Sequence, residues 1–266
     1  MAEQLNVKTS GEGDSNVVLL HGLFGSGNNL GQIARDLKED HLVHSVDLPD
    51  HGRSDWLQWA SIQGYARCVA AWMDDHQLTN CCVIGHSLGG KVAMQLAVNR
   101  PQLIRRLVIL DISPMAYTVR RHDHIFAGLN AVKAAGATTR ADAREVLLAH
   151  IDEPWVADFL LTSAYTDRSG LIDWRFNLAQ LEADYGQMLS GIEVQEARGL
   201  PCQIPSLVVR GADSGYVPKT TKQDFAHLFG ALNVVTVKNA GHWLHQEQTE
   251  TAVSYTHLTL PTMLWV

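Results

Sequence analysis

The chain has 266 residues, of which 46% are hydrophobic and 18% are charged, and its formal net charge is −7. This length fits one domain with an insertion better than two full domains. The chain is acidic and has no basic stripe, so we do not expect nucleic acid to be a partner.

The N-terminal residues and the cysteines give no targeting, membrane, disulfide or metal-binding pattern. Residues 1–16 have no basic region followed by an apolar one, and no run of about 18 apolar residues predicts a membrane span. The four cysteines lack disulfide or zinc spacing, so we expect no metal site. Cys81 and Cys82 open an apolar run and are expected to be buried. A reducing cytoplasm is the expected compartment.

Short apolar runs alternate with longer amphipathic stretches along most of the chain. The runs are β-branched and continuous, which is typical of parallel strands covered on both faces. The predicted strands are 16–22, 41–49, 81–87, 107–113, 206–212 and 233–242. The predicted helices between them are 29–40, 62–77, 90–101 and 219–230. This βαβα order predicts an α/β fold with a mostly parallel, doubly wound sheet.

The alternation stops between about Met115 and Leu200, where we find no convincing strand. Helical patterns cover 122–136, 139–151, 153–165 and 176–189. An insertion between two strands lies at the carboxyl edge of the sheet, where ligands bind in open α/β sheets. We therefore expect a four-helix cap over a site, rather than a purely structural elaboration.

These patterns divide the chain into a core, a cap and a tail. We assign 1–114 and 201–252 to the core and 115–200 to the cap. An amphipathic helix begins near Thr249, but its periodicity is lost in "SYTHLTLPTMLWV" and Pro261 interrupts it. We expect 253–266 to be a non-native or disordered tail.

The stretch "VIGHSLGG" carries the strongest chemical signal. Gly85, Ser87 and Gly89 form G-x-S-x-G between a predicted strand and a predicted helix, the context of a nucleophile elbow. The flanking positions need residues without a Cβ because the turn is tight. The alternative is a glycine-rich turn with a spectator serine. We predict that Ser87 is the nucleophile.

A serine nucleophile creates an oxyanion that needs two preorganised N–H donors. We predict that these are the backbone N–H of Leu88 and that of Leu23 in "HGLFGS". Phe24 is expected to line the acyl pocket, and His21 is expected to bond the loop backbone.

The general base must come from 13 histidines, so position decides. His242 follows the last predicted strand, as the chain order serine, acid, histidine requires. His245 is expected at a helix start and His86 at the elbow. We predict that His242 accepts the proton of Ser87.

Two aspartates compete for the acid. In this fold the acid usually stands three residues after the glycine in the strand before the histidine, but that slot holds Ser214, with Asp213 one residue early. A shift of one residue turns an extended side chain to the other side. Asp111 ends the strand next to the nucleophile strand and can approach the same ring. We favour Asp111, which would fix the tautomer of His242, and keep Asp213 as the alternative acid.

At this point the chain resembles the α/β-hydrolase superfamily and, more narrowly, the YbfF-like bacterial esterases. The matching stretches are "HGLFGSGNNLG", "DLPDHGRS", "GHSLGGKVAM", "LDISP", "VRRHDHIF", "WRFNL" and "NAGHWLH". The resemblance implies an α/β-hydrolase fold with a four-helix cap inserted after the sixth strand. It also implies that Asp111 serves the triad, whereas the "GADS" loop departs from the family pattern.

Two aromatic residues of the predicted cap, Trp174 and Phe176, could wall the acyl pocket or form the core of the cap. We predict both as pocket residues.

The predicted function is that of a serine carboxylesterase that forms an acyl-enzyme. Its expected substrates are small acyl esters of short to medium chain length, and the resemblance adds acyl-CoA thioesters. No metal or organic cofactor is expected. The alternatives are another serine hydrolase, acting on lactones or carbon–carbon bonds, and a ligand receptor on the same fold.

Overall fold

The apolar runs of the sequence form one seven-stranded sheet in the computed structural model, which describes residues 3–194, 201–218 and 222–259. The strand order is β1-β3-β2-β4-β5-β8-β9, and all neighbours are parallel except β1 and β3. The strands are β1 (Val7–Ser10), β2 (Asn16–Leu20), β3 (Leu42–Val46), β4 (Cys81–His86), β5 (Ile104–Leu110), β8 (Ser206–Gly211) and β9 (Leu232–Val237). The predicted mostly parallel α/β sheet is confirmed.

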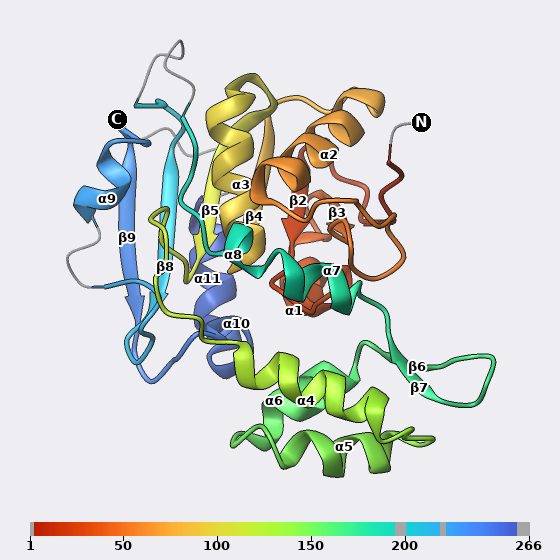
Figure 1. Ribbon diagram of the computed structural model, residues 1–266. Coiled ribbons are helices and arrows are strands. Elements are labelled where there is room, and N and C mark those ends of the chain that lie inside the picture. Colours follow the sequence, from red (N-terminus) through yellow and green to blue (C-terminus); the bar gives the residue numbers. More distant parts are fainter. Residues whose placement is uncertain (1–2, 195–200, 219–221, 260–266) are drawn as a thin grey trace.

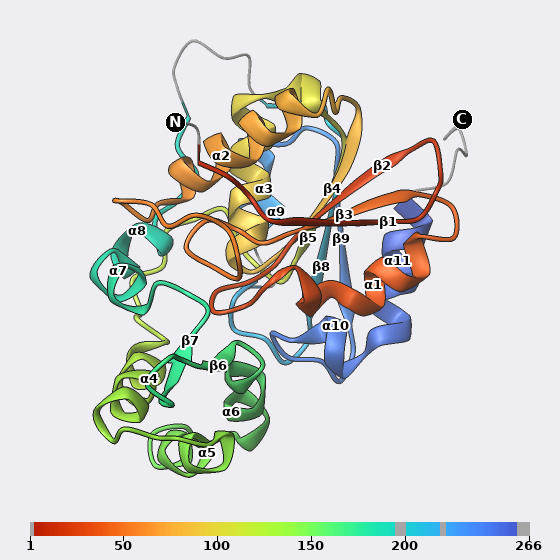
Figure 2. The same cartoon turned by 90° about the vertical axis from the view of Figure 1, so that its right-hand side faces the viewer.

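Helices cover both faces of this sheet (Figure 2). α2 (Ile62–Asp75) and α3 (Leu88–Asn99) lie on one face, and α1 (Gly31–Leu37) and α11 (Thr249–Thr259) lie on the other. The shorter helices of the core are η1 (Gly27–Leu30), η2 (Pro101–Leu103), α9 (Lys222–Ala226) and α10 (Leu244–Glu247). Because successive strand residues point to opposite faces, the sheet is buried between two apolar clusters.

Local sequence explains the start of α2 and the absence of β1 from the predicted strands. Helix α2 begins after Ser61, whose hydroxyl accepts a hydrogen bond from the N–H of Gly64. Strand β1 escaped prediction because it is a short edge strand without a continuous apolar run.

The C-terminal helix corrects one expectation. The sequence pattern predicts the loss of helical structure from Val253 onward. α11 instead continues to Thr259, so this expectation is wrong for residues 253–259. Ala252 is buried, and Val253 and Tyr255 pack against the second apolar cluster, which stabilises the helix without strict periodicity. Residues 260–266 of the predicted tail and 219–221 of the predicted helix 219–230 lie outside the described residues.

The helical insertion lies beyond the carboxyl ends of the strands, where Figure 1 shows α4, α5 and α6 beneath the arrowheads of β8 and β9. Its helices are α4 (Asp123–Ala134), α5 (Arg140–Leu148), α6 (Pro154–Leu161), α7 (Leu178–Ala183) and α8 (Tyr185–Met188). Three predicted helices are present, and the fourth is divided into α7 and α8 at Asp184. The insertion follows β5, the fifth strand in chain order, and not the sixth.

The insertion also contains a hairpin, so the expectation that it lacks strands is wrong. β6 (Ala164–Thr166) pairs antiparallel with β7 (Ile172–Trp174). Two strands of three residues are too short to stand out as apolar runs.

Across the described part of the chain, no helix combines the length and the apolar character needed to cross a membrane.

Candidate active site

Ser87 stands at the turn between β4 and α3, in a backbone conformation that few residues adopt. Its φ is 52° and its ψ is −119°. The neighbouring glycines are required by space. A Cβ on Gly85 would lie 2.3 Å from the carbonyl oxygen of Gly89, and one on Gly89 would lie 2.2 Å from that of Leu20. The G-x-S-x-G motif therefore forms the tight strand–helix turn that the sequence predicts.

His242 lies in the loop between β9 and α10 and faces the serine. Its Nε2 is 2.9 Å from the Oγ of Ser87. Two aromatic neighbours hold the residue: the ring of Tyr216 stacks on the imidazole at a centroid distance of 3.8 Å, and His86 Nε2 donates a hydrogen bond of 2.9 Å to the carbonyl of His242. Tyr216 thus holds the imidazole of His242 from its face, and His86 holds the backbone of the same residue.

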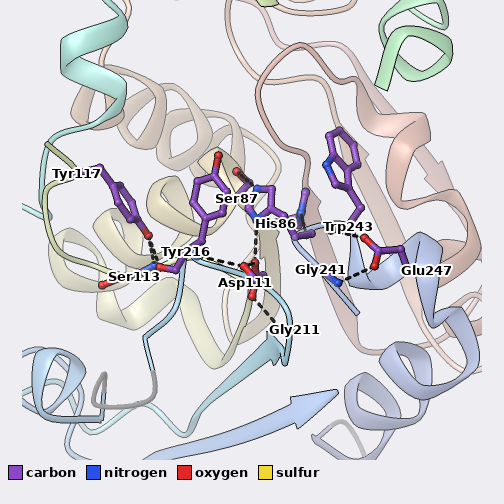
Figure 3. A network of polar contacts seen from close by, with 12 residues as sticks. His86, Ser87, Asp111, Ser113, Tyr117, Gly211, Tyr216, Gly241, Trp243 and Glu247 are labelled. Atoms are coloured by element: carbon purple, nitrogen blue, oxygen red, sulfur yellow. Dashed lines mark hydrogen bonds and ion pairs between the residues drawn. The ribbon is translucent and has the colours of Figure 1, made fainter. Parts of the chain in front are cut away.

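Asp111 approaches the other side of the same imidazole from the end of β5. Its Oδ2 is 2.8 Å from His242 Nδ1, and its side chain is fully buried. Asp111 also accepts a hydrogen bond of 2.9 Å from the N–H of Gly211 (Figure 3). It accepts another from the hydroxyl of Ser214. A carboxylate with three such partners can hold the Nδ1–H tautomer, which leaves Nε2 free to accept a proton.

Asp213 lies apart from this group. Its side chain is exposed, and within the described residues it makes no hydrogen bond to His242. Its backbone N–H donates to the carbonyl of Ala240 at 3.0 Å, which closes the loop. The geometry therefore brings Asp111, and not Asp213, to the histidine.

The two predicted oxyanion donors are free of other hydrogen bonds among the described residues. Leu88 is the first residue of α3, so its N–H has no acceptor within the helix. The N–H of Leu23 donates to no other described residue, whereas the next N–H, that of Phe24, is bound to His51 Nε2 at 3.2 Å.

His21 supports the loop that contains these donors. Its Nε2 accepts a hydrogen bond of 2.9 Å from the N–H of Leu48, and its Nδ1 lies 2.8 Å from the carbonyl of Gly22. Burial lowers the pKa of His21, which agrees with this neutral arrangement. Its position fits the structural role that the sequence predicts.

A cavity of about 250 Å³ opens above Ser87 between the core and the insertion. The core contributes Leu23 and Phe24, and apolar side chains of α4 and α6 form the opposite wall. These wall residues are Ile125, Val156, Phe159 and Leu160. The cavity is therefore apolar where α4 and α6 supply Ile125, Val156, Phe159 and Leu160. It is polar at the serine and where the insertion contributes Arg121, His122, His124 and Glu153.

Two predicted pocket residues are not in the cavity lining. Trp174 and Phe176 are buried and stack on each other at 5.7 Å, with the indole N–H of Trp174 3.3 Å from the carbonyl of Leu129. Phe176 lies 5.2 Å from the ring of Phe24, behind the cavity wall. The other interpretation, aromatic core of the cap, matches this position, because the wall in front of them is already filled by Phe24.

His122 is a cavity residue that sequence reasoning did not select. Its Nδ1 is hydrogen-bonded to the hydroxyl of Tyr185, and burial lowers its pKa to about 3, so the ring is neutral. It lies in "VRRHDHIF", one of the stretches that carry the resemblance, but nothing in the sequence assigned it a role in the site. Tyr216 and Ser214 also escaped selection as site residues. Only Ser214 had a signal, because it stands in the usual acid slot.

Among the described residues, no group of three or more His, Cys, Asp or Glu side chains is arranged to hold a metal ion. The polar groups at the cavity are instead arranged as a linear chain of serine, histidine and aspartate. Such a chain can activate a hydroxyl for attack on a carbonyl.

Fold and site together define a class. The chain belongs to the alpha/beta hydrolase fold family, whose model matches residues 16–249. It is a hydrolase, and its relatives include esterases and lipases.

Three similar proteins show how far the likeness extends. The chain is 36% identical over 237 residues to Esterase YbfF of Escherichia coli (strain K12), a match that covers 89% of each chain. It is 36% identical over 241 residues to the sn-1-specific diacylglycerol lipase ABHD11 of Xenopus laevis, covering 88% of this chain and 75% of that one. A solved structure described as a marine microorganism esterase has a TM-score of 0.92 at 29% identity and covers 97% of this chain and 100% of its own.

Proposed function

We propose that the chain is a serine carboxylesterase that hydrolyses acyl esters of short to medium chain length through an acyl-enzyme on Ser87. The observation that carries this proposal is the hydrogen-bonded chain from Ser87 through His242 to Asp111 at the floor of an apolar cavity of about 250 Å³. A cavity of this size suits a small acyl group better than a long one.

The first half of the reaction forms the acyl-enzyme. His242 Nε2 takes the proton of Ser87 as Oγ attacks the ester carbonyl, and Asp111 stabilises the resulting imidazolium. The N–H groups of Leu23 and Leu88 would bind the oxyanion. When the tetrahedral intermediate collapses, the bond to the alcohol breaks and His242 returns its proton to the departing oxygen.

The second half releases the acid. Water gives a proton to His242 and attacks the acyl carbonyl, and the Ser87 oxygen then leaves with that proton. Acyl-CoA thioesters present the same carbonyl to the same groups, so we include them as a second substrate class. The esterase and lipase names of the relatives support hydrolysis of acyl esters.

Covalent labelling combined with turnover tests this function. We expect a fluorophosphonate to label the wild type at one site and p-nitrophenyl butyrate to turn over many times per enzyme. Ser87→Ala should abolish labelling and lower kcat by about 10³-fold or more. The matched control Ser169→Ala, at an exposed serine, should behave as the wild type.

The remaining outcomes separate the alternatives. A wild type that is labelled but releases less than one product per enzyme would support a receptor and contradict the esterase. Thiol release from butyryl-CoA at a rate comparable to ester hydrolysis would support the thioester class, and its absence would remove that class alone.

A further inference from the structure

Lys91 is buried beneath the junction between core and cap. It stands one turn after Ser87 on α3, and 1% of its surface is exposed. Within the described residues it forms no ion pair. A buried ammonium without a counter-charge is costly, so its hydrogen-bond partners indicate why it is there.

Those partners are the two segments that join the cap to the core. The Nζ of Lys91 donates a hydrogen bond of 2.8 Å to the carbonyl of Met115, where the chain enters the cap. It donates a second one to the carbonyl of Ser190, where the chain leaves it. The Nζ also lies 4.8 Å from the ring centroid of Tyr117. Burial lowers the pKa of Lys91 to about 7, and the amine has hydrogens to donate in either protonation state.

The two segments also bind each other. The N–H of Tyr117 donates to the carbonyl of Leu189 at 2.8 Å, and the N–H of Ile192 donates to that of Pro114 at 2.9 Å. One amine on the nucleophile helix therefore binds two segments that are also hydrogen-bonded to each other.

Gln95 repeats this attachment one turn further along α3. Its amide donates to the carbonyl of Glu193 and accepts the N–H of the same residue, both at 2.9 Å. Gln95 reaches only the segment that leaves the cap, whereas Lys91 reaches both.

The segment that enters the cap is also connected to His242 through hydrogen bonds and a stacked ring. The hydroxyl of Tyr117 accepts the N–H of Ser113 and donates to the carbonyl of Tyr216, both at 2.8 Å (Figure 3). Tyr216 is the residue that stacks on His242.

We propose that Lys91 is a positioning residue, which fastens both cap connections to the nucleophile helix and so sets how closely the cap walls fit the acyl group. The inference rests on the proposed esterase reaction. The walls contributed by α4 and α6 belong to the cap, whereas Ser87 belongs to the core. Loss of the Lys91 amine should therefore slow the hydrolysis of esters whose acyl chains are long enough to contact these walls.

Lys91→Met tests this role because it keeps an unbranched apolar chain and removes the donors. We expect kcat/KM for p-nitrophenyl hexanoate to fall about tenfold or more, mainly through KM, because small misplacements of binding groups are costly. Hydrolysis of p-nitrophenyl acetate should change little. Lys133→Met, which removes the surface ion pair of Lys133 with Asp173, is the matched control and should leave both esters unchanged.

Active-site titration with a fluorophosphonate normalises each rate to correctly folded enzyme. Equal losses for both esters, or no loss for either, would overturn the positioning role. Lys91→Gln serves if the Met variant does not fold, since it retains a donor group and should give an intermediate loss for hexanoate. If neither variant gives labelled protein, Lys91 is needed for folding itself and the inference is overturned.

A double-mutant cycle adds a readout that a general structural defect would not produce. Tyr117→Phe removes the hydroxyl that joins the entering segment to Tyr216. We expect its effect on hexanoate hydrolysis to be smaller in the Lys91→Met background than alone, because both changes release the same segment. Independent, multiplicative effects would contradict the inference. If the wild type hydrolyses neither ester, the proposed function fails; if the wild type is active and Lys91→Met matches it, only this inference fails.

Discussion

The hydroxyl of Ser214 donates a hydrogen bond to Oδ2 of Asp111, the same oxygen that faces His242. Ser214 follows β8, in the slot where this fold usually carries its acid, while the carboxylate itself comes from β5. The two strands are parallel neighbours, so their carboxyl ends meet at one edge of the sheet. The carboxylate beside His242 thus comes from β5, and the slot after β8 supplies a hydrogen-bond donor to it.

Ser214→Ala should weaken the reaction without abolishing it. A hydrogen bond to a charged group contributes about 1.5–3 kcal/mol, so we expect kcat for p-nitrophenyl butyrate to fall by about tenfold or more. Ser214→Thr, which keeps the hydroxyl, should recover most of that loss. An Ala variant with the wild-type kcat would show that the bond does not orient Asp111 for the reaction.

Val156→Phe should change which acyl chains are accepted. Val156 lies on α6 and lines the cavity, so a larger ring there fills space that the acyl chain would occupy. We expect kcat/KM to fall more for octanoate than for acetate in a series of p-nitrophenyl esters. Val119→Phe, at a valine that is 59% exposed, is the control. A uniform loss over the series would argue that the acyl chain points elsewhere.

Acid should destabilise the protein through its buried histidines. Burial lowers the pKa of His51, His122 and His245 from 6.5 to about 3. In the unfolded chain these side chains bind a proton near pH 6.5, so the stability they confer is present above that pH and is lost as pH falls toward about 3. Each one can contribute up to about 1.4 kcal/mol per pH unit in that window.

His245→Phe isolates one of these contributions. Both ring nitrogens of His245 are buried without a hydrogen-bond partner among the described residues, and burial lowers the pKa of the side chain to about 3. The variant therefore removes a group that stays neutral in the folded state across the measured pH range. We expect the free energy of unfolding, measured with urea from pH 7 to pH 4.5, to fall less steeply than in the wild type. His227→Phe, at an exposed histidine, should keep the wild-type slope. An unchanged slope in His245→Phe would contradict the account.

Much of the fold was predictable because its signals are local. The apolar runs of β2, β4 and β8 are continuous, and the turn around Ser87 excludes side chains at Gly85 and Gly89. These features depend on residues that are neighbours in the chain, so they can be recognised in the sequence. The placement of His242 and Asp111 needed one further rule, that parallel strands end at the same edge.

What could not be predicted depends on contacts between distant segments. The stacking of Tyr216 on His242 and the burial of Lys91 beneath the cap connections have no local pattern. The position of Trp174 and Phe176 behind Phe24 depends on how the hairpin of the cap folds over the core loop. Composition alone left both interpretations of these aromatic residues open.

The most direct test of the central claim compares Asp111→Asn with Asp213→Asn. If Asp111 orients His242, its amide variant should lower kcat for p-nitrophenyl butyrate by about 10³- to 10⁴-fold, because the amide favours the wrong tautomer. Asp213→Asn should keep nearly the wild-type rate, since its side chain is exposed and away from the imidazole. A collapse of activity in Asp213→Asn, with Asp111→Asn still active, would contradict the proposed triad.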